Sequence, residues 1–422
     1  MSDHASTDHA STDQTPHALT RRTALKGGAA LSAASALAVI APATPWTWSP
    51  AQSVPGTGSG ADPHRVGDPE CDDLVADLAR RGEIPTVNRL LKHWTRNGQP
   101  LPDGLPHDLH EFLQRAVALP SWTDRGKLAA AARFNEKRGT YLGVIYGFVS
   151  GMLSTVIPHE ARAVYYSWGG SAMKDRISKT AKLGYDIGTA NAFAPDGEHV
   201  VTCVKTRLAH AGVRHILPRS PYWQHAADEE LPISQADMMV TWHSLPTSAM
   251  RQFRKWGVPV AADESAGFLH SWQLTAHALG IADEYIPSSW ASAESQAKQV
   301  LDPVIDATPE GIKLAHMLLD LGKNLDLSLV SRGVLGAITR FMLGDQIADD
   351  LKIPREPVWS PMLEVSWGPY VAVREGILQA GMPPKAYWLF DEFLRQFVLL
   401  YMSELRLPIS IQIPVMNNPH YR

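Results

Sequence analysis

Apolar residues recur at every third or fourth position through most of the chain between Asp72 and Leu405, whereas stretches of strict apolar and polar alternation are few. The first spacing is that of a helix with one buried face, and the second is the one that a half-buried strand requires. The sequence therefore predicts an all-α fold. The expected helices cover residues 72–81, 108–118, 124–138, 200–211, 235–256, 265–279, 292–300, 309–321, 325–343 and 385–405, and the expected breaks are Pro195, Pro218, Pro232, Pro259, Pro287, Pro303 and Pro354.

Composition excludes several classes of protein. Of 422 residues, 45% are hydrophobic and 19% are charged, so the chain can bury a large core and is not a disordered protein. Its net charge of −4 and the lack of a basic cluster argue against nucleic acid as a partner. Cys71 and Cys203 do not match a zinc or CxxCH spacing, and both a disulfide between them and two separate thiols stay open.

The N-terminal region is typical of an export signal. Arg21 and Arg22 precede a short apolar stretch, and residues 41–43 read Ala-Pro-Ala, as at a signal peptidase site. We interpret residues 1–43 as a twin-arginine signal of a secreted, extracellular protein, with a retained anchor as the alternative. That route carries folded proteins, which favours a cofactor inserted before export. The remaining divisions are a Pro/Gly/Ser-rich linker at 44–70, a helical domain at 71–405 and an irregular tail at 406–422.

Residues 141–158 contain no Asp, Glu, Lys or Arg. The stretch is barely long enough to cross a bilayer, and its glycines and hydroxyl residues lower its apolarity, so we expect a buried core helix and no stable membrane insertion. Gly143, Gly147 and Gly151 would admit either a second helix or a flat ligand, and both alternatives stay open.

Two common catalytic motifs are absent. His159-Glu160 begins like the HExxH helix of a zinc protease, but Ala163 stands where the second histidine would be. Gly147 to Gly151 and Gly169 to Met173 both misplace the serine that a hydrolase elbow requires.

One predicted helical face carries Arg176, Lys179, Thr180 and Leu183, which are spaced three and four residues apart. This face mixes charge with apolarity. An ordinary solvated helix surface has the same pattern, so the spacing alone does not assign a function.

A second helical face carries Arg207, His210 and Arg214, with His215 about 140° around the helix from His210. An imidazole flanked by two arginines tends to stay neutral, as a metal ligand must, and the arginines could pair with carboxylates of a cofactor. A solvated face or a capping group is the alternative.

These faces belong to an ordered set of motifs that resembles the latex-clearing protein family of secreted rubber oxygenases, from about Asp72 to about Leu405. The motifs are Leu119–Asp124, Arg138–Leu142, Arg176–Thr180, Arg207–His215 and Trp242–His243. The resemblance implies a globin-like helical core, at about residues 125–290, that encloses one non-covalent haem b, with additional N- and C-terminal helices. It also implies that dioxygen is the co-substrate and that the double bonds of cis-1,4-polyisoprene are cleaved endo-wise, which gives oligo-isoprenoids with aldehyde and ketone ends. The absence of CxxCH agrees with a haem that is not covalently attached.

The resemblance also assigns roles to individual residues. His210 matches the proximal iron ligand, and Lys179 matches a distal lysine that can take the sixth position in a closed state. Glu160 matches the distal acid, for which we hypothesise a role as the base that removes an allylic proton. The remaining candidates are Arg176 and Thr180 on the distal side, Arg207 and Arg214 around the haem through propionate or structural pairing, and His215 as a further haem contact.

Other functions would fit the same pattern. A haem oxygenase of another apolar molecule is one alternative, and a secreted haem- or lipid-binding helical protein without turnover is another. No heptad repeat predicts a coiled coil, so a monomer is expected.

Overall fold

The computed structural model describes residues 45–167, 172–323, 331–379 and 408–419. Within these ranges the protein consists of helices and connecting segments without a strand, and two isolated β-bridges join Ser53 to Pro287 and Ser167 to Asn417. The prediction of an all-α fold is thereby confirmed. The export signal predicted at 1–43 and the helix predicted at 385–405 lie outside the described residues.

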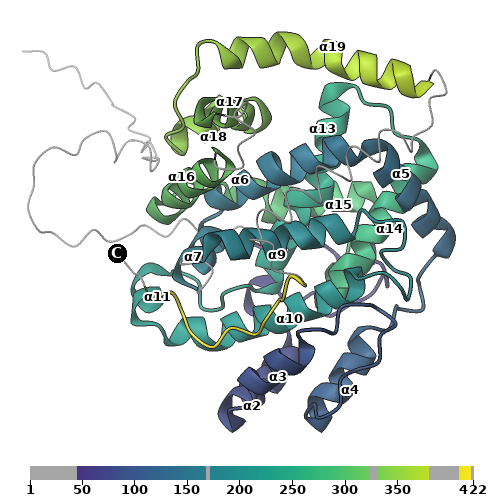
Figure 1. Cartoon of the computed structure of the whole chain (residues 1–422), viewed down its shortest axis with the longest axis vertical. Helices are drawn as coiled ribbons and strands as arrows, with labels where there is room; N and C mark the ends of the chain where they lie inside the picture. The colour runs from purple at the N-terminus through teal and green to yellow at the C-terminus, as the bar shows by residue number, and fades with distance from the viewer. Residues whose placement is uncertain (1–44, 168–171, 324–330, 380–407, 420–422) are drawn as a thin grey trace, which may run out of the picture. The chain divides into compact units, whose positions relative to one another are not determined.

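The helices follow one another through short connections (Figure 1). They are α2 (Pro69–Arg81), α3 (Ile84–Leu91), α4 (His107–Ala116), α5 (Arg125–Val144), α6 (Gly151–Leu153), α7 (Pro158–Tyr166), α9 (Met173–Asp186), α10 (His199–Ile216), α11 (Pro221–Ala226), α12 (Gln235–Trp242), α13 (Ser248–Trp256), α14 (Ala262–Ala278), α15 (Trp290–Val300), α16 (Pro309–Lys323), α17 (Arg332–Leu343), α18 (Asp345–Asp350) and α19 (Trp359–Gln379). Two π-helical turns, η3 (Ile145–Ser150) and η6 (His243–Thr247), interrupt longer helices.

Helices α5 and α14 pack along each other at the centre of the core. Gly267 permits this close approach, because a Cβ there would lie 2.5 Å from the backbone oxygen of Lys127. Phe134 of α5 and Phe268 of α14 pack beside it with their rings tilted and the ring centroids 4.6 Å apart. Burial of these aromatic rings away from water supplies much of the free energy that holds the two helices together.

The uncharged stretch after Arg138 continues α5 through η3 and α6. Tyr141, Leu142 and Ile145 are buried in the main core cluster, so this segment is a core helix, as expected. By length and composition alone, Arg125–Val156 is the one helix among the described residues that could cross a membrane. Of its most apolar 18 residues, 56% are buried inside the protein.

The Pro/Gly/Ser-rich segment that we expected as a linker packs on the helices where the structure describes it, from residue 45 onward. The Trp48 side chain is buried, the Val54 N–H donates to the Ile286 carbonyl at 2.8 Å, and the Tyr285 hydroxyl donates to the Ala61 carbonyl at 3.1 Å. These contacts explain how a segment of low helical propensity takes one conformation.

The C-terminal residues 408–419 form an extended strap across α10 (Figure 1). The strap exchanges two hydrogen bonds with Asn88 through the backbone of Ile413, both at 2.9 Å. Gly212 of α10 makes room for it, because a Cβ at that position would lie 2.7 Å from Pro414. The irregular tail is therefore packed in this part.

Candidate active site

His210 lies in the fourth turn of α10, which packs against α9, α14 and α2. Burial lowers the pKa of His210 to about 3, and the charges of Arg214 and Arg176 contribute. The imidazole is therefore neutral at physiological pH, as expected, although burial rather than the flanking arginines is the main cause. Its Nδ1 atom is buried and has no hydrogen-bond partner among the described residues. Because an enclosed Nδ1 leaves no room for a metal, the nitrogen available to a metal ion or to the metal of a cofactor is Nε2.

Arg176 of α9 is near enough to His210 and to Glu160 for its charge to act on both. Burial lowers the pKa of Arg176, whereas Glu160 raises it. All three side chains are deeply surrounded by protein, yet each residue keeps part of its surface accessible. This combination is typical of groups that line an internal cleft.

Glu160 stands in the first turn of α7 and accepts a hydrogen bond of 2.5 Å from the Thr241 hydroxyl of α12. Burial raises the pKa of Glu160 to about 7, and the negative charge of Asp237 adds to this rise. Thr241, Arg176 and His159 act in the opposite direction. A carboxyl with this pKa exchanges its proton readily near neutral pH, which is the property required of a general base.

Lys179 and Thr180 follow Arg176 on α9. The Lys179 ammonium pairs with Asp175 at 2.6 Å, one turn earlier on the same helix. Thr180 is exposed and donates to the Arg176 carbonyl at 3.2 Å. In this structure, therefore, neither side chain hydrogen-bonds to Glu160 or His210.

Arg207 and Arg214 make structural pairs with the N-terminal turn of α2. Arg207 binds the carboxylate of Asp68, and Arg214 donates to Asp72 at 2.7 Å. We considered haem propionates and protein groups as partners of these arginines, and the structure shows pairing with protein carboxylates. Both pairs attach α2 to the helix that carries His210.

His215 lies in the last turn of α10, away from this group. Burial and the charge of Arg219 lower its pKa, and its backbone carbonyl accepts a hydrogen bond from Arg219. The structure thus brings Glu160, Arg176 and His210 together and gives no hydrogen bond between His215 and any of these three.

The glycines of the central helix bear on the open question of a second helix or a flat ligand. A Cβ at Gly143 or Gly147 would meet no described atom within 4 Å, so no described helix packs on either position. Between them, Tyr146 reaches α9, where a Cβ at Gly184 would lie 3.5 Å from its ring. Both glycines are exposed among the described residues, so the alternatives of a second helix and a flat ligand both stay open.

Sequence reasoning missed three polar residues around Glu160: Thr241, which donates to it, and the pair of Asp237 and His159. Asp237 and Thr241 are four residues apart and share one face of α12, which could have marked them. Ser234 and Asp237 also form a capping box that the sequence spells out. Nothing in the sequence, however, places that face beside Glu160, which lies about 80 residues earlier.

Comparisons with known proteins agree with this geometry. Residues 138–375 match the family model described as "ER-bound oxygenase mpaB/B'/Rubber oxygenase, catalytic domain". A protein named rubber oxygenase from Streptomyces sp. (strain K30) is 50% identical over 404 residues, which make up 95% of this chain and 99% of that protein. A solved structure of latex clearing protein in its closed state matches with a TM-score of 0.79 and 50% identity, over 88% of this chain and 100% of that one.

The helical fold and the matched catalytic domain define an oxygenase. More narrowly, the chain belongs to the rubber oxygenase, or latex-clearing protein, family.

Proposed function

We propose that this protein is a rubber oxygenase that cleaves the double bonds of cis-1,4-polyisoprene endo-wise, giving oligo-isoprenoids with aldehyde and ketone ends. The observation that carries the proposal is 50% identity over 95% of the chain to a protein named rubber oxygenase. The constellation of Glu160, Arg176 and His210 supports it, because these residues match the family positions and are brought together in the structure.

The cofactor in this proposal is one non-covalent haem b, whose iron would supply the activation of dioxygen. The residues present fit such a group at His210, where a neutral imidazole has its Nδ1 enclosed by protein and its Nε2 left for a ligand. Lys179 would be a second residue that holds the haem, for which it must leave Asp175 and lose its proton. Thr180 would stand beside Lys179 on the same face of α9.

Glu160 is the proposed base. In its carboxylate form it takes a proton from the carbon next to the double bond, and it returns that proton when the carbon chain separates. Thr241 orients the carboxylate through its 2.5 Å hydrogen bond, and the positive charge of Arg176 favours the ionised form. The net reaction adds both oxygen atoms to the two carbons and leaves the proton count unchanged.

The polymer sets a further requirement, because polyisoprene has no polar group to bind. The protein must hold it through apolar surface and keep water from the reacting carbons. The space over Gly143 and Gly147 is a candidate for part of this path, since it is lined by small residues of the apolar central helix.

Location and assembly complete the proposal. The arginine pair at 21–22 directs the folded, haem-loaded protein out of the cell, where it acts as a monomer on the surface of the polymer. Neither nucleic acid nor stable insertion into a membrane is part of this function.

The decisive experiment measures dioxygen uptake by the purified mature protein mixed with polyisoprene latex, together with carbonyl-ended oligomers in the same sample. We expect uptake coupled to aldehyde and ketone formation. A haem-loaded preparation that consumes no dioxygen with latex would contradict the substrate and favour another apolar molecule. A protein that contains haem but never consumes dioxygen with any alkene would be a binding protein.

A further inference from the structure

His159 and Asp237 form a charged pair directly behind the proposed base. His159 precedes Glu160 in α7, and its Nδ1 lies 2.9 Å from Oδ1 of Asp237 on α12. The other Asp237 oxygen accepts hydrogen bonds from the backbone N–H and the hydroxyl of Ser234, at 2.9 and 3.0 Å. Both carboxylate oxygens of Asp237 are thus held by groups of the protein. The carboxylate cannot turn away from His159 without losing the capping box at the start of α12.

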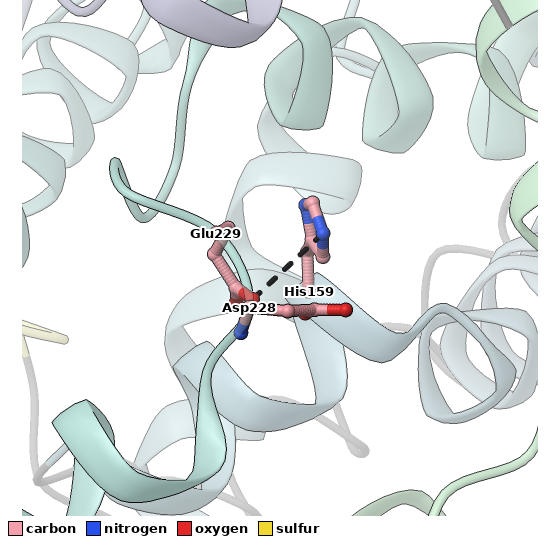
Figure 2. Close-up of side chains that lie close together, drawn as sticks. All are labelled: His159, Asp228 and Glu229. Atoms are coloured by element: carbon pink, nitrogen blue, oxygen red, sulfur yellow. Dashed lines mark hydrogen bonds and ion pairs between the residues drawn. The ribbon is translucent and has the colours of Figure 1, made fainter. Parts of the chain in front are cut away.

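On its other side, His159 faces two acidic residues from the segment after α11 (Figure 2). Its Nε2 lies 3.8 Å from Oε2 of Glu229, and Asp228 stands beside them at the surface. This group of one imidazole and two carboxylates has the donor atoms of a metal site. Arg162, however, already binds both Asp228 and Glu229 and offsets part of their charge, so we do not interpret this group as a metal site.

The charges around Glu160 come from three helices. Asp237 of α12 disfavours its carboxylate, whereas Arg176 of α9 and His159 of α7 favour it, and Thr241 donates the hydrogen bond. His159 in turn is faced by Asp237, Glu229 and Arg162. Burial works against the charged form of His159, but its hydrogen bond to Asp237 and the nearby carboxylates raise its pKa above the usual value.

We propose that His159 is a positioning residue that compensates the charge of Asp237 and so keeps Glu160 available as a carboxylate. The inference rests on the proposed role of Glu160 as a base. With His159 protonated, the pair with Asp237 is close to neutral as seen from Glu160. Without His159, an uncompensated buried carboxylate lies near the base and makes its ionisation more difficult.

This reasoning predicts non-additive effects of two substitutions. His159→Gln keeps a hydrogen-bond donor for Asp237 but removes the positive charge, so the pKa of Glu160 should rise by about one unit. Asp237→Asn removes the negative charge. It also removes the carboxylate that most strongly favours the protonated imidazole of His159, so both charges are lost and the pKa of Glu160 should change little. The double variant should therefore return close to the wild-type value, although His159→Gln alone does not.

The test is an infrared difference titration of the purified protein, with the carbonyl stretch of the Glu160 carboxyl identified as the band that Glu160→Gln removes. The wild type, His159→Gln, Asp237→Asn and the double variant are each titrated in this way and are then assayed for dioxygen uptake with latex as a function of pH. We expect the midpoint of the infrared titration and the acid limb of the activity profile to move together to higher pH in His159→Gln, and both to return in the double variant. His64→Gln is the matched control, because His64 forms a similar pair with Asp62, at 2.8 Å, on an exposed turn.

An infrared midpoint that is the same in His159→Gln and the wild type would overturn the inference. So would a double variant shifted as far as His159→Gln, since a purely structural role predicts no rescue by removal of the Asp237 charge. If the infrared midpoint moves as expected but activity does not follow it, the pair tunes Glu160 and the proposed base is wrong. The two failures are thereby distinguished.

Discussion

Glu160 is placed where a carboxylate is least well solvated, and this cost is tied to its proposed task. It stands near the N-terminus of α7, where the helix dipole favours a negative charge, and Arg176 favours it as well. Burial outweighs both and brings the pKa to about 7. An ordinary surface glutamate, with a pKa near 4.5, would be a weaker base by more than two units.

Replacement of Glu160 by Gln should separate activity from stability. Loss of a general base lowers the rate by about 10²–10⁴-fold. Because the buried carboxylate is poorly hydrated, removal of its charge should leave the melting temperature unchanged or raise it. Dioxygen uptake with latex, haem content and thermal melting of the same preparation check this, and near-full activity with normal haem content would remove Glu160 from the mechanism.

The wild-type pH profile follows from the same pKa. Only the carboxylate form of Glu160 accepts a proton, so the rate should rise with pH below about 7 and level off above it. The slope below the midpoint should be tenfold per pH unit for one proton. Initial rates of dioxygen uptake between about pH 5 and pH 9, a range that brackets the midpoint, test this. A profile flat through that range would contradict the assignment.

The ion pair of Lys179 with Asp175 sets up a competition for the lysine. If Lys179 binds the haem iron, it must first leave Asp175. Asp175→Asn should therefore raise the ratio of lysine-bound to lysine-free haem by up to about fivefold, since such a partly exposed ion pair contributes up to about 1 kcal/mol. The absorption spectrum of the resting haem protein measures this, with Lys179→Ala as the lysine-free reference. If the spectrum of Lys179→Ala were identical to that of the wild type, Lys179 would not be a ligand of the haem.

At this scale, the sequence predicted residues that stand in recognisable patterns and missed those that act through tertiary contacts. Arg176 and His210 were identified through ordered motifs, and Glu160 through the family resemblance that those motifs carry. Asp237 and Thr241 were not, because their function depends on how α12 packs against α7. Local spacing contains no information about that contact.

At the scale of elements, hydrophobic periodicity located most of the helices and failed where helix-breaking residues were tolerated. The helix predicted at 235–256 is interrupted by η6, where Pro246 lies inside a π-helical turn. The Ser244 hydroxyl there lies 2.8 Å from that of Ser150 in η3, so the two π-helical turns meet. Helix α19 was not predicted, since Pro369 stands within it. Packing against neighbouring helices overrides both local preferences.

Helix α19 is held to α5 by a buried ion pair that joins the two ends of the region matched by the family model. Arg138 donates to Glu375 at 2.6 and 2.8 Å, and the Tyr141 hydroxyl adds a third hydrogen bond at 3.2 Å. A second Arg138 nitrogen donates to the Pro259 carbonyl. The motif Arg138–Leu142 thus acts as an attachment point between distant parts of the chain.

Removal of one partner of this pair should be costly. Glu375→Gln leaves the Arg138 charge buried without its counter-ion and should lower the free energy of unfolding by about 3–5 kcal/mol. Replacement of both residues, as Arg138→Met with Glu375→Leu, should recover much of that loss because neither charge then remains. Urea denaturation of the haem-loaded protein measures both. A double variant no more stable than Glu375→Gln would mean that the hydrogen bonds, rather than the charges, hold the helix.

At the scale of the whole molecule, the state of the cysteines agrees with folding before export. The chain has two cysteines, and both are free thiols buried against α2 and α10. Burial raises the pKa of Cys71 and Cys203, which keeps them protonated and unreactive. Since no disulfide has to form, the fold can be completed in a reducing cytoplasm. This agrees with a route that carries folded proteins.

Replacement of Arg21 and Arg22 by lysine should therefore keep the protein inside the cell, folded and loaded with haem. A matched control is the replacement of Arg80 and Arg81 by lysine, because this second arginine pair lies at the end of α2, away from the signal. The ratio of rubber-dependent dioxygen uptake in the medium to that in the cell lysate measures export. We expect that ratio to fall at least about tenfold for the signal variant, as a recognition change worth about 1.4 kcal/mol or more would produce, and to stay unchanged for the control. Equal export of the signal variant would contradict the twin-arginine route, whereas an inactive, haem-free protein retained inside would show that folding, rather than recognition of the signal, had failed.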